Sequence, residues 1–358
     1  MNPYKTDILF RLIAPIARKS ALLAATVYAG SYFAGIAICA YIDGGINGAD
    51  NRWPHESLLR IVCLGCMMFV GLIVLCRFYG QIMRACGYLQ GGEIIASRDS
   101  EQLGQFLRRW EGAYNNIYIA SAAAILALGA TVFGYLSRSG HWSGYDGGCT
   151  AVYARLFGVA NWFWVFLVTY KCFVTVWGVR RALRFEVVIR PLHPDRSGGL
   201  EPIGKLSLSI SYILSFLMVF LALTYSFDDL AKRHPVLIIP GLLIYISAPF
   251  MMLGMLSEAH EKMKQKKREA IERLRITLDH YYAKLIRGSK DEILDTNAAE
   301  DIRRTCDLNE VLDKTPVWPL DIGSITRFLT TTALPAIVFL FDVVMSRDSW
   351  VHELLFGP

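Results

Sequence analysis

Residues 121–130 (SAAAILALGA) and 210–223 (ISYILSFLMVFLAL) decide the fold, because neither stretch has a polar face. A helix that is apolar on every side would expose large apolar patches in water, which soluble proteins avoid. A lipid bilayer covers such a helix without any protein partner. Both stretches therefore predict helices that cross a membrane.

Seven segments have the length and polarity of a membrane-crossing helix. About 20 mostly apolar residues, rising about 1.5 Å each, cross a hydrocarbon layer about 30 Å thick. The segments are residues 20–42, 57–79, 114–136, 156–179, 206–227, 236–257 and 325–345. The composition agrees, with 54% hydrophobic and only 19% charged residues. The sequence predicts an all-α protein, a polytopic transmembrane bundle of six to seven crossings with a cytosolic helical hairpin or coiled-coil insertion.

The segments divide the chain into three parts. Residues 1–257 are predicted to form a transmembrane domain, in which an amino-terminal interfacial helix precedes six crossings. The alternative for this amino-terminal arm is a frayed tail. Residues 258–323 are the predicted cytosolic insertion, and residues 324–358 hold the last hydrophobic segment and the carboxyl tail.

Lys and Arg gather in every second connection between the segments, starting with the amino-terminal arm. Because basic residues near segment ends resist translocation, this alternation places the amino terminus in the cytosol. The seventh segment carries Arg327, Pro335 and Asp342. If it crosses the membrane, the carboxyl terminus is outside; if it lies on the surface or re-enters, both termini are cytosolic.

A charged helical pattern continues from the sixth segment into the insertion. Apolar residues recur at intervals of three, four or seven from Leu256 to Leu285, Gly288 is a plausible stop, and a second pattern ends before Pro316. This hairpin or stalk either meets copies of itself or covers the cytosolic face of its own protomer. A basic cluster near the membrane consists of Lys262, Lys264, Lys266, Lys267 and Arg268. It would attract anionic lipid or an anionic ligand.

Residues 191–200 (PLHPDRSGGL) stand out from the apolar background. Two prolines fix local dihedrals, and two adjacent glycines allow backbone amides to point into one anion-binding concavity. We therefore predict a ligand-binding elbow, whose candidate residues are Arg190, His193, Asp195, Arg196, Gly198 and Gly199. The alternative is an ordinary tight turn in which Asp195 caps the next helix.

Residues 316–321 (PVWPLD) precede the last apolar segment, where a Trp between prolines is typical of an interfacial anchor. Together, LHPDRSGGL and PVWPLD resemble segments of a loosely characterised group of bacterial polytopic inner-membrane proteins, over residues 190–344. Some polytopic proteins of similar build are effectors of anti-phage defence. They include the Hailong type, in which a nucleotide-derived ligand made by a partner enzyme holds an oligomeric channel shut. The resemblance implies a multi-pass inner-membrane homo-oligomer with a nucleotide or oligonucleotide ligand.

Lys171 and Asp342 are the candidate functional charges within the apolar segments, where a charge costs about 2.5 to 3.5 kcal/mol on insertion scales and usually has a role. Lys171 either snorkels to the inner surface or faces a bundle interior or a wet pore. Asp342 is the candidate ion-pair partner of Lys171 across a protomer boundary. Its position near the outer end of the segment also fits a carboxylate that is simply hydrated.

Catalytic and metal-binding motifs are missing from the sequence. It has no phosphate-binding loop, no H-E-x-x-H and no G-x-S-x-G, so we predict no enzyme activity, no cofactor and no duplex nucleic-acid binding. Cys63 and Cys66 lie inside an apolar helix and are interpreted as packing residues, not as metal ligands. On the predicted topology only Cys149 lies in an external loop, with Cys39 near the outer boundary, which suggests no disulfide framework.

The functional hypothesis is a homo-oligomeric ion channel or pore that an anionic ligand gates from the cytosol, with membrane depolarisation in anti-phage defence as one role. A secondary transporter is the first alternative, although the sequence shows no internal repeat and no matched pair of broken helices. A structural or scaffolding membrane protein is the second.

Overall fold

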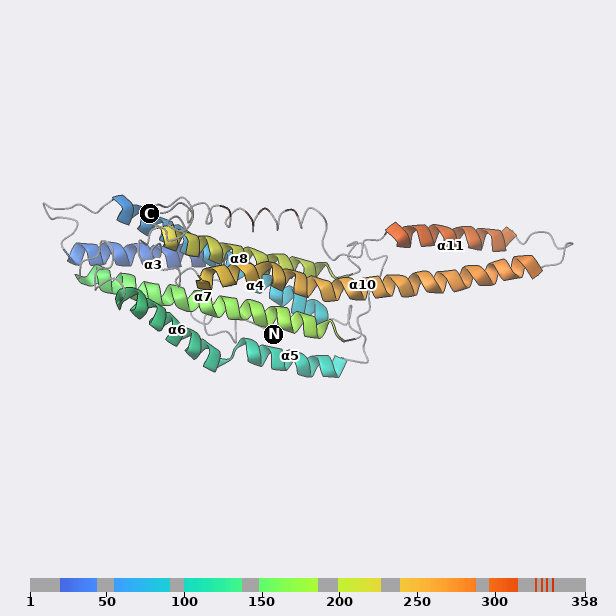
Figure 1. The fold of residues 1–358 in the computed structure, drawn as a ribbon, viewed down its shortest axis with the longest axis horizontal. Coiled ribbons are helices and arrows are strands. Elements are labelled where there is room, and N and C mark those ends of the chain that lie inside the picture. The colour runs from blue at the N-terminus through green and yellow to red at the C-terminus, as the bar shows by residue number, and fades with distance from the viewer. Residues whose placement is uncertain are drawn as a thin grey trace, which may run out of the picture.

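The computed structural model describes residues 20–43, 55–90, 100–136, 148–185, 199–226, 239–287 and 296–314, with the single residues 326, 330, 333 and 337. This part of the chain is helical and contains no strand, which confirms the predicted all-α bundle (Figure 1). The helices are α3 (Ala21–Ile42), α4 (His55–Gln90), α5 (Ser100–Tyr114), α6 (Ile117–Leu136), α7 (Gly148–Ala182), α8 (Glu201–Ser226), α10 (Ile239–Arg287) and α11 (Thr296–Lys314).

Five stretches of the described helices are long and apolar enough to cross a membrane. They are Ala21–Ile42, Ile61–Leu89, Glu101–Val132, Gly148–Ala182 and Glu201–Phe220. These stretches overlap the first five predicted segments, and the sixth corresponds to the first part of α10. By length and composition the chain is a multi-pass membrane protein. Most of the seventh segment, including Asp342, lies outside the described residues, as does the amino-terminal arm.

Helix α4 packs between α3 and α8, α8 also packs against α10, and α7 contacts α3, α5, α6, α8 and α10. On α8 the buried side chains Leu206, Ile210, Leu214 and Leu217 recur every three or four residues, as one face of a helix requires. The outward faces are apolar too. On the peripheral helix α6, Ile125 is 71% exposed in the protomer, which in water would be unfavourable and in a bilayer is favourable.

Helix α5 differs from the prediction, because the sequence assigns these residues to a basic connection between two crossings. Its buried side chains are Leu103, Leu107, Trp110 and Tyr114, spaced by four, three and four residues, and its polar face carries the exposed Arg108 and Arg109. It packs against α7. The predicted third crossing therefore begins at Ile117 in α6, and the side-chain oxygen of Asn116 accepts from the Tyr118 N–H (2.9 Å) at the start of that helix.

Helix α10 is continuous over 49 residues and leaves the bundle. Its last side chain in the bundle core is Met263, and α11 runs back along the part beyond it (Figure 1). Lys267 Nζ on α10 donates to the carbonyl oxygen of Asp313 on α11 (2.7 Å). We call residues 264–287 and α11 together the stalk. The described part of α10 ends at Arg287, and the predicted stop Gly288 lies outside the described residues.

The stalk extends away from the ends of the other helices and does not fold over them (Figure 1). Of the two predicted arrangements, the hairpin that covers its own protomer is therefore not the one observed. We call this end of the bundle the stalk end. The carboxyl ends of α4 and α7 lie there with the amino end of α8, because α4 and α7 run toward the stalk and α8 runs away from it.

Candidate functional site: a buried lysine between tyrosines

Lys171 on α7 is the most unusual side chain in the described bundle, because it is only 2% exposed among apolar neighbours. Its Nζ donates a hydrogen bond to the hydroxyl of Tyr79 on α4 (2.9 Å). The same atom lies 4.7 Å from the centre of the Tyr114 ring and 5.4 Å from that of Tyr79. The Tyr114 ring and the Tyr79 hydroxyl oxygen therefore both lie beside the ammonium, an arrangement that stabilises a cation out of water.

This position decides between the predicted roles of Lys171. The residue lies about three turns before α7 ends at Ala182, yet its ammonium stays inside the protomer and does not reach the stalk end. The snorkelling alternative is thus not observed, and the side chain faces the bundle interior. Tyr79 and Tyr114 are 0% and 1% exposed, so the charge is not on an open surface of the protomer either.

The amphipathic helix α5 brings Tyr114 to the lysine, and two hydrogen bonds fix α5 on α7. Trp110 Nε1 donates to the carbonyl oxygen of Val174 (3.1 Å), and the Tyr170 hydroxyl donates to that of Ala113 (2.8 Å). The indole of Trp110 lies directly over Gly178, where a Cβ atom would come within 2.0 Å of the ring. Only glycine at 178 permits this approach, so the α7 sequence itself determines how α5 docks.

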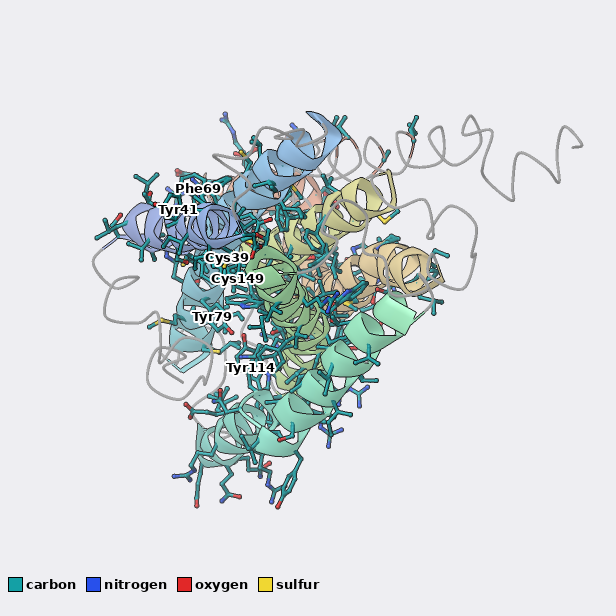
Figure 2. The ribbon with its side chains drawn as sticks, turned by 90° about the vertical axis from the view of Figure 1, so that its left-hand side faces the viewer. Cys39, Tyr41, Phe69, Tyr79, Tyr114 and Cys149 are labelled. Carbon is teal, nitrogen blue, oxygen red and sulfur yellow. The ribbon has the colours of Figure 1, made fainter. Side chains whose placement is uncertain are left out.

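The rings also contact each other. Tyr79 and Tyr114 meet edge to face, with ring centres 6.1 Å apart and planes at 88°. Figure 2 shows both tyrosines deep in the bundle when it is viewed from the end opposite the stalk. We call Tyr79, Tyr114 and Lys171 the lysine cage. It links α4, α5 and α7 through one charge, so a change in that charge or in the docking of α5 affects all three helices.

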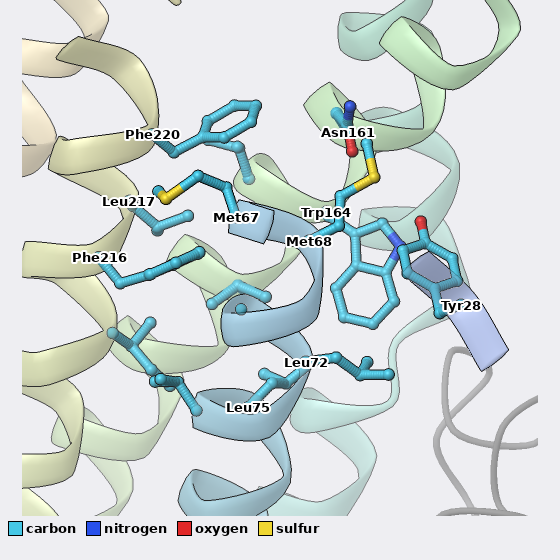
Figure 3. Close-up of a pocket in the computed structure, with 15 residues that line it drawn as sticks. Tyr28, Met67, Met68, Leu72, Leu75, Asn161, Trp164, Phe216, Leu217 and Phe220 are labelled. Atoms are coloured by element: carbon cyan, nitrogen blue, oxygen red, sulfur yellow. The ribbon is translucent and has the colours of Figure 1, made fainter. Parts of the chain in front are cut away.

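A second feature is an apolar cavity nearer the middle of the bundle (Figure 3). It has a volume of about 80 Å³, lies between α3, α4, α7 and α8, and is partly open to the surroundings. Its walls include Met67, Leu75, Trp164 and Phe216, and Asn161 contributes an amide. Such a wall suits an acyl chain or another apolar molecule and offers few polar groups to a hydrated ion.

The predicted elbow is described only at its last residues. Gly199 has φ +89°, a left-handed conformation that favours glycine, and a Cβ there would lie 3.4 Å from the hydroxyl of Tyr88 on α4. Leu200 is fully buried, and its carbonyl oxygen accepts from the N–H groups of Ile203 and Gly204. Leu200 is therefore the residue that precedes α8. Arg190, His193, Asp195, Arg196 and Gly198 lie outside the described residues.

The predicted basic cluster lies on α10 where the helix leaves the bundle. Lys266 forms an ion pair with Glu269 (2.8 Å), and Lys267 holds α11 through Asp313. The hydrogen bond from Lys266 keeps the pKa of Glu269 below its ordinary value. Lys264 and Arg268 are exposed, and Lys262 is half-buried. Lys266 and Lys267 therefore stabilise the stalk, whereas Lys264 and Arg268 are exposed at its base.

Within the described residues, no group of three or more His, Cys, Asp or Glu side chains could hold a metal ion. Sequence reasoning singled out Lys171 but missed Tyr79, Trp110 and Tyr114. The signal for α5 was present in the spacing of Leu103, Leu107, Trp110 and Tyr114. No periodicity signals the contact between Tyr79 and Lys171, which are 92 residues apart.

Comparison with protein-family models, with curated proteins and with solved structures gives no match for this chain.

Proposed function

We propose that this protein is a homo-oligomeric ion channel of the bacterial inner membrane, gated from the cytosol by an anionic, nucleotide-type ligand. The observation that carries the proposal is the continuity of α10. Met255, Ala259 and Met263 are buried in the bundle core, and the same helix then becomes the stalk. Pro249, the proline inside α10, lies before these three residues, so no proline kinks the helix between them and the stalk, and a displacement of the stalk moves side chains packed inside the bundle.

Several copies are needed because the described protomer has a packed apolar interior, and its cavity is lined mainly by apolar side chains. An ion path that stays hydrated then runs between protomers. The stalk supports self-association, since it carries exposed apolar side chains at Ile276 and Tyr282 on α10 and at Leu308 and Val311 on α11. These residues would bury apolar surface against a second stalk.

The charge distribution supports an anionic ligand at the stalk end. Arg180 and Arg181 lie in the last turn of α7, and Arg180 reaches α10, with its Nη1 atom 3.6 Å from where a Cβ on Gly254 would be. Lys264 and Arg268 are exposed a few turns further along α10. Basic residues at this end also favour its cytosolic placement. The resemblance of the LHPDRSGGL and PVWPLD segments supports a role in anti-phage defence, with the ligand made by a partner enzyme.

Recording from planar bilayers tests the proposal. The purified full chain is reconstituted in phosphatidylethanolamine and phosphatidylglycerol, and current is recorded before and after addition of cyclic and linear oligonucleotides on the stalk side. Discrete conductance steps are expected, and one of these anions is expected to change their open fraction. Neutralising Lys264→Gln and Arg268→Gln together should reduce that response about tenfold or more, because two exposed charges leave the ligand surface.

Arg303→Gln is the matched control, since it removes an exposed charge from α11, away from the base of the stalk. It should leave both conductance and response unchanged. A sealed bilayer at every protein concentration contradicts the channel. Substrate-dependent flux without conductance steps would instead identify a secondary transporter.

A further inference from the structure

The two cysteines at the end of the bundle opposite the stalk are in contact. Cys39 lies in the last turn of α3 and Cys149 in the first turn of α7, and their sulfur atoms are 2.8 Å apart although 110 residues separate them. Figure 2, viewed from this end, shows the two side chains where α3 and α7 meet. Both are free thiols in this structure.

Asp43 holds the two helix ends together around this thiol pair. One carboxylate oxygen accepts from the N–H of Cys149 (2.8 Å), and the other accepts from the N–H and the hydroxyl of Thr150 (2.8 and 2.7 Å). The carboxylate from the end of α3 thus satisfies N–H groups in the first turn of α7. Gly148 has φ +79°, and a Cβ there would lie 2.5 Å from the same carboxylate, so glycine permits the close approach.

The next turns of the two helices are also in register. The Tyr153 hydroxyl on α7 donates to the carbonyl oxygen of Ser31 on α3 (3.0 Å). The Tyr153 ring also covers Gly35, where a Cβ would come within 2.1 Å of it. Two hydrogen-bonded contacts on either side of Gly35 therefore keep α3 and α7 from sliding apart. The thiols meet because the whole α3–α7 interface brings them together.

The position of the pair also determines its redox environment. The basic residues of the described bundle gather at the stalk end, which is the cytosolic end by the rule that basic connections stay inside. The opposite end then faces the bacterial periplasm, where thiol pairs are oxidised. Cys306 lies on the stalk, at the reducing end. Compartment and geometry thus single out one pair from the eight cysteines.

We infer that Cys39 and Cys149 form a reversible disulfide that clamps α3 to α7 at the periplasmic end of the bundle. The oxidant is the disulfide of a dithiol oxidase or of a small thiol. The Cys149 thiol, the more exposed of the two, loses its proton and attacks that disulfide, which releases one thiol and leaves a mixed disulfide. Cys39 loses its proton and attacks the Cys149 sulfur, which releases the second thiol. Two protein thiols are oxidised by two electrons, and the oxidant's disulfide becomes two thiols.

Differential thiol labelling in cells tests this inference independently of any channel activity. Cells that produce the full chain are denatured in sodium dodecyl sulfate with N-ethylmaleimide, which blocks every free thiol, and the protein is then reduced and labelled with a polyethylene-glycol maleimide. The wild-type chain is expected to gain a label at both positions. Cys149→Ser should lose both labels, because Cys39 is then free at the quench, whereas Cys306→Ser should keep both.

Peptide mass spectrometry of the wild-type chain, digested without reduction, keeps the test decisive if Cys149→Ser folds poorly. A cross-linked peptide that joins Cys39 to Cys149 is expected. Alkylated Cys39 and Cys149 without a cross-link would overturn the inference. Persistence of both labels in Cys149→Ser would overturn it too, because the disulfide would then join other cysteines.

Discussion

The ammonium nitrogen of Lys171 lies 4.7 Å from the centre of the Tyr114 ring. Lys171 belongs to α7, which is long and apolar enough to cross the membrane. Tyr114 is the last residue of the amphipathic helix α5, which packs against α7. A buried cation beside an aromatic face gains about 2 kcal/mol when both are removed from water. One contact therefore couples the docking of α5 to the electrostatics of the bundle core.

A double-mutant cycle measures this coupling. Tyr114→Leu should destabilise the wild-type protein by about 1–2 kcal/mol more than it destabilises Lys171→Met, because only the wild type retains a cation for the ring. Lys171→Met alone should be near neutral, since removal of a buried charge offsets the lost contacts. Unfolding in detergent, followed by near-ultraviolet circular dichroism, gives the free energies. Additive effects of the two substitutions would show that the charge and the ring do not interact.

Gly178→Ala should release α5 from α7. A Cβ at this position would lie 2.0 Å from the Trp110 ring, so the indole or the helix must move, at an expected cost of about 1–3 kcal/mol. Tryptophan fluorescence should shift to longer wavelength, and protease should cut near α5 more rapidly. Gly112→Ala on α5 is the control, because no atom lies within 4 Å of its Cβ position. Equal behaviour of the two variants would contradict the role given to Gly178.

Asp43 makes the junction of α3 and α7 sensitive to acid. Hydrogen bonds from the Thr150 hydroxyl, the Thr150 N–H and the Cys149 N–H hold the pKa of Asp43 below its ordinary value. The ionised carboxylate thus stabilises the fold above the unfolded-state pKa of about 3.9, and this contribution is lost as the pH falls through the lowered folded-state pKa. Asp43→Asn should lower the Tm at neutral pH, and its difference from wild type should shrink below about pH 4.

Asp279→Asn, a change at an exposed carboxylate on the stalk, is the comparison for Asp43→Asn. Thermal unfolding across the pH range should show little change for it at any pH. A Tm deficit of Asp43→Asn that stays constant down to the lowest pH would mean that its carboxylate charge is not what stabilises the junction.

The stalk should control the oligomeric state. Leu308 and Ile276 are 44% and 61% exposed in the protomer, and burial of such a side chain against a second stalk contributes about 1.5–3 kcal/mol. Leu308→Asp and Ile276→Asp should each weaken association about tenfold or more. Thr277→Asp, at an exposed polar neighbour, should have a much smaller effect. Mass photometry in detergent gives the distribution, and an oligomer that both apolar substitutions leave intact would assign assembly to the bundle.

Prediction from sequence was most accurate where one segment alone contains the signal. The apolar runs that became α3, α6 and α8 were recognised because nothing but lipid suits a helix without a polar face. Helix α5 was missed because its apolar residues are few and its arginines matched the pattern of a basic loop, although its spacing of Leu103, Leu107, Trp110 and Tyr114 was visible.

The sequence by itself determined that this protein is an all-α membrane protein with a charged helical extension, because hydrophobicity and helical period are properties of continuous segments. Only the tertiary structure decided that Lys171 is enclosed by Tyr79 and Tyr114, and that Cys39 meets Cys149 beside Asp43. These contacts join residues that are 57 to 110 positions apart. Their geometry depends on which helix faces pack together, and the apolar lipid-facing and core-facing residues of a membrane helix look alike in sequence.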